Sequence, residues 1–234
     1  MEESIRFAIA KSSSYVRKKG ERKMACRGVL WDMDGTVLDT LADLHAAVNM
    51  SLRHFSLPEA SPEAVRAGLG NGAAYLISQV APEERRQKVL AFYKPYYDAH
   101  CNIRTRPYPG ILPLMEALKA RGVRQAIISN KPHPAVKALA DAYFPGLLDS
   151  AVGESETVRR KPNPDAVLAA VKEMGLDLDD CVYIGDTEVD LDTARNAGMA
   201  CIAVSWGFRS REQLIQAGAI RIADSAEKLA DMLL

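Results

Sequence analysis

Short apolar runs alternate with amphipathic segments along most of this chain, and the alternation predicts its secondary structure. Runs that are mainly apolar or β-branched, and that stop at turn residues, are typical of buried strands. They occupy residues 29–31, 123–128, 150–153, 181–184, 200–204 and 219–223. The segments between them repeat apolar residues at helical spacing. Because strands and helices alternate, we expect an α/β core with a doubly wound parallel sheet of the Rossmann-like kind.

The stretch between the first strand and residue 105 follows a different pattern. Apolar residues recur at helical spacing in four segments, 40–55, 63–68, 74–80 and 82–100. No part of this stretch has the two-residue alternation of a strand. The apolar and aromatic residues from Val89 to Tyr97 are more typical of a buried core than of a binding surface. We therefore predict an all-helical cap at 41–104, inserted into a catalytic core formed by 24–40 and 105–234.

Residues 1–23 do not share the pattern of either unit. They are rich in serine and basic residues, which favours a disordered extension or a start codon placed upstream of the natural one at Met24. A short amphipathic helix that packs on the core is the alternative. The apolar piece Phe7–Ala10 is too short for a secretory signal, and the acids Glu2, Glu3 and Glu21 argue against a transit peptide. We therefore expect a cytoplasmic protein.

The composition narrows the possible partners. Lysine and arginine together number 30, and so do aspartate and glutamate, so no basic excess favours nucleic acid. No apolar run approaches the ~20 residues of a membrane span. The four cysteines are scattered and fit a reducing compartment, and the four histidines lack the spacing of a zinc site. We expect a small-molecule partner, with no nucleic acid or membrane, and a monomer or homodimer.

Polar residues gather where the predicted strands end. They are Asp32 and Asp34, Ser129 and Asn130, Lys161, and Asp186 and Asp190. Because the carboxyl ends of parallel strands meet at one edge of a sheet, we expect these residues to converge. Carboxylates that crowd one point repel each other unless a hard cation lies between them, and Mg²⁺ suits carboxylate and phosphate oxygens. Ser129 and Lys161 would stabilise charge on a phosphoryl group, so the pattern indicates phosphoryl transfer.

These clusters match the four motifs of the haloacid dehalogenase-like hydrolase superfamily. The chain resembles it in Asp-x-Asp-Gly-Thr at 32–36, in Ser129, in Lys161, and in Gly-Asp-x-x-x-Asp at 185–190. Within the superfamily the chain is most similar to bacterial phosphoglycolate phosphatases. The weaker signals for this are residues 70–73, 108–110, 129–132 and 205–208. The resemblance implies an Mg²⁺-dependent phosphatase that acts on a small phosphorylated metabolite, most directly 2-phosphoglycolate.

The resemblance also implies a role for each motif residue. Asp32 would attack phosphorus and form an aspartyl-phosphate, and Asp34 would serve as the general acid and base. Ser129 and the backbone amide of Asn130 would hold the phosphoryl group. Lys161 would offset the charge on Asp32 and on the phosphoryl oxygens.

A metal site and a mobile cap follow from the same resemblance. Mg²⁺ would be held by Asp32, the backbone carbonyl of Asp34, and Asp186. Asp190 would act on the metal indirectly, for example through a water. The cap would close over the site, with Asn71 and Gly72 facing the substrate, and its first hinge would lie at residues 39–40.

Several related activities stay open. Asp34 argues against a haloacid dehalogenase or a phosphonatase, which depart from the Asp-x-Asp pattern. A pyrophosphatase, a 5′-nucleotidase and a β-phosphoglucomutase-like mutase share the motifs, although 129–131 favours a phosphatase. A catalytically silent regulatory module is opposed by the presence of both Asp32 and Asp186.

Overall fold

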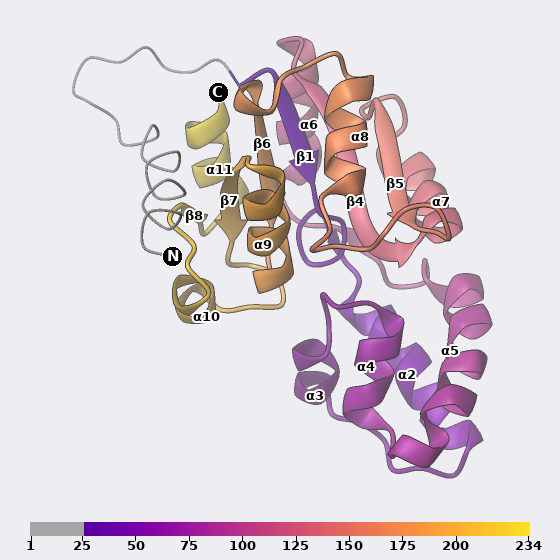
Figure 1. Cartoon of the computed structure of the whole chain (residues 1–234). Coiled ribbons are helices and arrows are strands. Elements are labelled where there is room, and N and C mark those ends of the chain that lie inside the picture. Colours follow the sequence, from indigo (N-terminus) through magenta and orange to yellow (C-terminus); the bar gives the residue numbers. More distant parts are fainter. Residues whose placement is uncertain (1–25) are drawn as a thin grey trace, which may run out of the picture.

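A six-stranded parallel sheet forms the centre of the computed structural model, which describes residues 26–234 (Figure 1). Its strand order is β5-β4-β1-β6-β7-β8, and every neighbouring pair in it runs parallel. The strands are β1 (Gly28–Trp31), β4 (Arg124–Pro132), β5 (Ser150–Glu154), β6 (Cys181–Gly185), β7 (Ala200–Val204) and β8 (Ile222–Ala223). The predicted fold class is confirmed.

Helices cover both faces of the sheet because side chains of a strand alternate between the faces. Val29 and Trp31 point to the face covered by α6 (Ile111–Ala120), α7 (His133–Tyr143) and α11 (Ala226–Leu233). Leu30 points to the face covered by α8 (Asp165–Glu173) and α9 (Glu188–Ala197). The first strand is fully buried in the middle of the sheet, between β4 and β6. The chain order reverses beside β1, which is the point where open α/β sheets bind their ligands.

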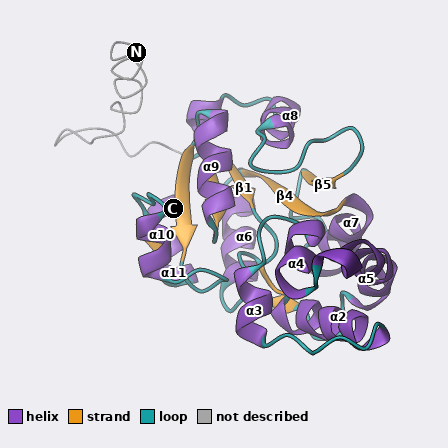
Figure 2. Ribbon diagram, turned by 60° about the horizontal axis from the view of Figure 1, so that its bottom comes forward, coloured by secondary structure: helices purple, strands orange, loops and turns teal. Residues whose placement is uncertain are grey.

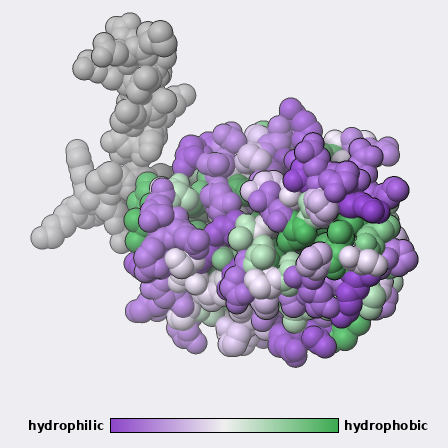
Figure 3. All heavy atoms as spheres, turned by 90° about the horizontal axis from the view of Figure 1, so that it is seen from below, coloured by the Kyte–Doolittle hydropathy of each residue, from purple (hydrophilic) through white to green (hydrophobic). Residues whose placement is uncertain are grey.

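Four helices make up the insertion that follows β1, and they stand over one end of the sheet (Figures 1 and 2). They are α2 (Leu41–His54), α3 (Pro62–Ala67), α4 (Ala73–Val80) and α5 (Arg86–His100), with a 3-10 turn at Glu83–Arg85. Val89, Tyr93 and Tyr97 of the predicted stripe are buried, whereas Leu90, Phe92 and Tyr96 are only partly buried. Seen from this end, the surface is mostly hydrophilic with small hydrophobic areas between (Figure 3). The boundaries 40/41 and 104/105 remain our proposal for the cap.

Two short strands, β2 (Leu38–Asp39) and β3 (Arg106–Pro107), connect the insertion to the core as an antiparallel pair. Beside them, the buried carboxylate of Asp43 accepts hydrogen bonds from the backbone N–H groups of Ile103, Arg104 and Thr105 and from the Thr105 hydroxyl. Asp43 belongs to the first helix of the insertion, and its partners belong to the returning chain. One side chain therefore fastens both connections together.

We expect Asp43→Ala to lower the free energy of unfolding by about 3 kcal/mol, because it leaves three backbone N–H groups, that of the buried Thr105 among them, without their carboxylate partner. Urea unfolding followed by circular dichroism measures this. Asp141→Ala is the matched control, because the Asp141 side chain is 76% exposed and its lysine pair is long. A cost below about 0.5 kcal/mol for Asp43→Ala would mean that the carboxylate does not fasten the two connections.

Some elements differ from the sequence prediction. The strand predicted at 123–128 is β4, and it continues to Pro132 instead of ending near Ile128. After an irregular stretch, Pro132 still pairs with Glu154 of β5. Helix α10 (Arg211–Gln216) was not predicted; it has only six residues and begins at a capping box formed by Ser210 and Gln213. The predicted extension at 1–23 lies outside the described residues. Within residues 26–234, no helix has the length and apolar character that a membrane crossing requires.

Candidate active site

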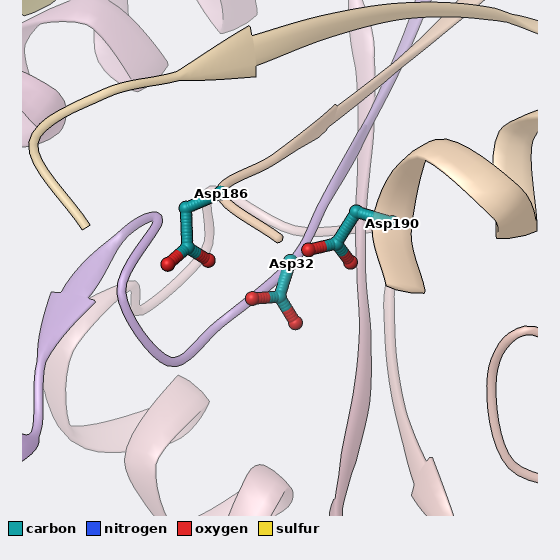
Figure 4. Close-up of side chains that lie close together, drawn as sticks. All are labelled: Asp32, Asp186 and Asp190. Carbon is teal, nitrogen blue, oxygen red and sulfur yellow. The ribbon is translucent and has the colours of Figure 1, made fainter. Parts of the chain in front are cut away.

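Three buried carboxylates meet at the carboxyl edge of the sheet (Figure 4). Asp32 directly follows β1, Asp186 follows the neighbouring β6, and Asp190 lies in the first turn of α9. Each offers an oxygen that lies within 4.8 Å of the others. The convergence arises because β1 and β6 are parallel neighbours, so both chains leave the sheet at the same edge.

The ammonium group of Lys161 joins two of these acids. Its Nζ donates to Asp32 Oδ1 at 2.6 Å, to Asp190 Oδ1 at 2.7 Å and to the Tyr183 hydroxyl at 3.1 Å. The side chain of Asn130 fixes the lysine in place, because it accepts from Lys161 N at 2.7 Å and donates to Lys161 O at 3.1 Å. Burial alone would lower the pKa of Lys161, but Asp190 and Asp32 together raise it well above its usual range.

Two glycines make room for Asp186. Its carboxylate accepts from Phe208 N at 2.6 Å and from Thr36 Oγ1 at 3.1 Å. A Cβ on Gly35 or on Gly207 would lie 2.3 Å from Asp186 Oδ2, and Gly35 has a φ of +87°. Burial raises the pKa of Asp186 well above its usual range, and the charges of Asp32 and Asp190 raise it further. The Gly-Thr of the first motif therefore shapes a compartment for this acid.

The general acid predicted from the sequence, Asp34, pairs with a lysine that sequence reasoning did not assign. Asp34 Oδ1 lies 2.9 Å from Lys131 Nζ, and the Lys131 side chain is only 2% exposed. The same ammonium donates to the hydroxyl of Tyr97, on cap helix α5. Lys131 belongs to β4, so this contact crosses from core to cap. The sequence shows Lys131 directly after Ser129 and Asn130, which could have indicated a site residue. A lysine after a strand, however, usually lies in a solvated loop.

Ser129 and Asn130, both predicted to hold the phosphoryl group, line the pocket. Ser129 is buried, lines the pocket beside Asp32 and Asp34, and its hydroxyl accepts from Lys131 N at 3.2 Å. Asn130 also lines the pocket, but its side chain is occupied by Lys161 and by Gly70 O, to which it donates at 2.9 Å. The Asn130 side chain is therefore not available to a ligand, and phosphoryl binding by the Asn130 backbone amide remains a prediction.

Only some residues of the glycine-rich cap loop at 70–73 line the pocket. Gly70 and Gly72 line the pocket, whereas Asn71 is not part of its wall and its carbonyl accepts from Arg160 Nη1 at 3.3 Å. The structure thus brings Gly72, but not the predicted Asn71, to the pocket wall. Substrate binding by either residue remains a prediction.

Further contacts hold the cap against the core. Arg209 Nη2 donates to Leu69 O at 3.0 Å, and its guanidinium also pairs with Glu188 at 2.8 and 2.9 Å. From the cap side, Arg66 Nη1 donates to Gly207 O at 3.2 Å. These arginines were missed because an arginine in a helix or loop carries no sequence signal for a particular backbone acceptor. These contacts hold the cap docked on the core over the pocket.

The charges of the site fit a divalent cation. Four carboxylates (Asp32, Asp34, Asp186 and Asp190) face two ammonium groups (Lys131 and Lys161), which leaves a net charge of −2. Burial raises the pKa of Asp32 to about 7 although Lys161 lowers it, because the neighbouring Asp190 and Asp34 add repulsion. A divalent cation would offset this charge and keep the acids ionised. The donor set, all carboxylate, suits a hard metal ion.

The acids do not have equal freedom to bind such an ion. Asp190 Oδ1 accepts from Lys161, and its Oδ2 accepts from Thr187 N at 3.1 Å and from Thr187 Oγ1 at 2.8 Å. Asp32 Oδ2 receives only a long contact of 3.4 Å from Thr36. Both oxygens of Asp186 also accept hydrogen bonds, from Phe208 N and from Thr36 Oγ1, so Asp32 Oδ2 has the weakest protein contact of the three acids. The division into direct ligands (Asp32 and Asp186) and an indirect one (Asp190) remains a prediction.

The sequence that builds this site matches a known protein family. The model of the haloacid dehalogenase-like hydrolases matches residues 29–204, which include all four motifs. The chain belongs to this hydrolase family. This confirms the family and the enzyme class that the motifs predicted.

Individual relatives share most of the chain. Phosphoglycolate phosphatase 1 of Pseudomonas aeruginosa is 31% identical over 218 residues, which cover 87% of this chain and 78% of the relative. N-acetylmuramic acid 6-phosphate phosphatase of the same organism is 31% identical over 225 residues, which cover 91% and 96%. A Lactobacillus delbrueckii crystal structure, assigned as a phosphoglycolate phosphatase, is 40% identical and superposes with a TM-score of 0.86, covering 90% and 99%.

Proposed function

We propose that the protein is an Mg²⁺-dependent phosphatase that hydrolyses 2-phosphoglycolate to glycolate and phosphate through an aspartyl-phosphate. The observation that carries this proposal is the single pocket that Asp32, Asp34, Ser129 and Lys161 line together at the sheet edge. The relatives named phosphoglycolate phosphatase support the choice of substrate.

The first half-reaction is carried by the two acids of the first motif. The Asp32 carboxylate attacks phosphorus, so a bond forms between its oxygen and phosphorus while the bond to the leaving alkoxide breaks. Asp34 gives its proton to that alkoxide. Asp32 can be approached from the pocket through Oδ2, since Oδ1 is held by Lys161 at 2.6 Å.

The second half-reaction releases phosphate. Asp34, now a carboxylate, takes a proton from the water that attacks the aspartyl-phosphate, and Asp32 leaves as a free carboxylate. The Ser129 hydroxyl, the Asn130 amide and the Lys161 ammonium stabilise the charge that spreads over the phosphoryl oxygens in both steps. When Mg²⁺ is bound by Asp32, the Asp34 carbonyl and Asp186, it supplies further positive charge next to that group.

The cap side of the pocket favours a small leaving group. Its lining there is largely apolar, with Leu44, Leu69, Leu76 and Tyr93 facing the core acids. These side chains are nearly completely buried and leave few polar partners for a sugar or a nucleoside. The setting we propose is the cytoplasm, because all four cysteines are free thiols. We propose a monomer or homodimer with no macromolecular substrate.

A panel assay tests the proposed function. Phosphate release would be measured with Mg²⁺ and with EDTA on 2-phosphoglycolate, N-acetylmuramic acid 6-phosphate, pyrophosphate, a nucleoside monophosphate and β-glucose 1-phosphate. We expect 2-phosphoglycolate to have a kcat/KM at least about tenfold above every other compound of the panel, and EDTA to remove the activity. A preference for another ester would retain the chemistry and overturn the substrate, whereas activity in EDTA would contradict the metal's role.

A further inference from the structure

We propose that Lys131 and Tyr97 form a subsite that binds a carboxylate on the leaving group and thereby sets the substrate preference. The proposal rests on the proposed function, since it identifies how the same pocket selects a substrate. It assigns a chemical class, a phosphate ester with a carboxylate one carbon from the ester oxygen, to two residues on different parts of the fold.

Lys131 has a donor left for a ligand. Its ammonium carries three N–H groups, of which one donates to the Tyr97 hydroxyl, while Asp34 Oδ1 lies 2.9 Å away as an ion-pair partner. The residue lines the pocket, although its side chain is only 2% exposed. A buried cation in a pocket with an unused N–H is a strong receptor for an anion, because water does not screen it.

Tyr97 supplies a second donor. Its hydroxyl oxygen accepts from Lys131, which leaves the O–H hydrogen free to donate into the pocket that the residue lines. The ring is fixed by stacking on Tyr93, with 5.5 Å between centroids and an interplanar angle of 4°. Lys131 Nζ also lies 4.5 Å from the centre of the Tyr97 ring. One N–H of Lys131 and the O–H of Tyr97, on two groups joined by a hydrogen bond, suit the two oxygens of a carboxylate.

The position of this pair fits the chemistry of Asp34. In the proposed reaction Asp34 gives a proton to the ester oxygen, so that oxygen lies within hydrogen-bond distance of the Asp34 carboxyl. In 2-phosphoglycolate a single CH₂ separates the ester oxygen from the carboxylate. Because Lys131 Nζ lies only 2.9 Å from Asp34 Oδ1, a carboxylate at that spacing reaches it. A substrate with a longer arm would place its charge against the apolar lining.

The subsite is complete only when the cap is docked. Lys131 comes from β4 of the core and Tyr97 from α5 of the cap, so each contributes one donor across the interface. A ligand carboxylate would bridge the two and favour the closed arrangement by its own binding energy. Binding of the leaving-group carboxylate and closure of the cap are thus coupled.

The test compares two esters that differ only at this group. 2-Phosphoglycolate is paired with 2-hydroxyethyl phosphate, in which a hydroxymethyl group replaces the carboxylate. We expect the wild type to prefer the first by about 100-fold in kcat/KM, the size of a hydrogen-bonded charge pair. Lys131→Met should reduce that preference to within about threefold, and Tyr97→Phe should reduce it by about tenfold.

Two controls separate selection from other roles. Lys94→Met removes an exposed lysine that also borders the pocket, and we expect the preference to stay unchanged. If Lys131 served only to position Asp34, Lys131→Met would slow both esters equally and leave the preference intact. That result, or a preference that falls in Lys94→Met instead, would overturn the subsite.

Binding separates this proposal from the proposed function. In an Asp32→Asn background, which cannot turn over, calorimetry with Mg²⁺ measures the affinity for each ester. We expect 2-phosphoglycolate to bind more tightly, and Lys131→Met to erase the difference. If the wild type does not hydrolyse 2-phosphoglycolate, the proposed function fails, while tight, Lys131-dependent binding still supports the subsite. Equal affinities for the two esters would refute the subsite whatever the turnover.

Discussion

Asp32→Asn should lower kcat on 2-phosphoglycolate by about 10⁴-fold or more, because it removes the nucleophile of the proposed reaction. An asparagine has almost the same shape, and the site keeps Asp190 as a partner for Lys161 at 2.7 Å. We therefore expect the fold to persist, which thermal unfolding would show as a transition close to that of the wild type. Phosphate release in single-turnover and steady-state assays measures the loss.

Trapping the aspartyl-phosphate distinguishes a nucleophilic Asp32 from an Asp32 that contributes only its charge. Wild-type protein quenched in acid during turnover of ³²P-labelled substrate should retain label on the chain, and Asp32→Asn should retain none. Asp192→Asn, which changes an exposed acid of α9, is the matched control and should behave like the wild type. Substantial turnover by Asp32→Asn, or label retained on it, would refute the assignment of the nucleophile.

Asp34→Asn should show an effect that depends on the leaving group. With 2-phosphoglycolate, whose alkoxide needs a proton, we expect kcat to fall by about 10³-fold. With p-nitrophenyl phosphate, whose phenolate leaves without a proton, the first step should fall much less. A burst of p-nitrophenol equal to the enzyme concentration should follow, because the second step still requires a base.

The ³²P label that remains on the chain after an acid quench also tests the role of Asp34. Asp34→Asn should accumulate the aspartyl-phosphate that the wild type turns over quickly, so more label should remain after the acid quench. Equal losses on both esters with no burst would mean that Asp34 does not transfer the proton. In that case its pairing with Lys131 at 2.9 Å would be its main contribution.

The sequence predicted the layout of the core because each signal was local and repeated. Buried runs such as 29–31 and 181–184 became the central strands, and the rule that parallel strands end at one edge brought Asp32, Asp186 and Asp190 together. The same argument placed Lys161 near them, and the structure shows its direct contact with Asp32. The family expected from the motifs is confirmed by the match over residues 29–204.

The contacts that were missed depend on distant parts of the chain. Tyr97 of α5 meets Lys131 of β4 across the boundary between cap and core, and the periodic stripe of α5 indicated no more than burial. Arg209 donates to the backbone carbonyls of Arg66 and Leu69 in the cap, and a backbone carbonyl cannot be recognised from the residue type that carries it. The strands β2 and β3 have two residues each, too few to show an alternation. Periodicity therefore predicts which face is buried but not what that face meets.

The pairing of Asp39 with Arg106 makes the chain leave the core and return to it at adjacent points. An insertion with neighbouring ends closes with little extra loop entropy whatever its length, so its size is nearly independent of the sheet. The acids that act on phosphorus thus lie outside the inserted segment, whereas recognition of the leaving group is shared between Tyr97 of the insertion and Lys131 of the core. A grafted or shortened cap is therefore expected to change the substrate range while Lys131 and the phosphoryl chemistry at Asp32 stay as they are.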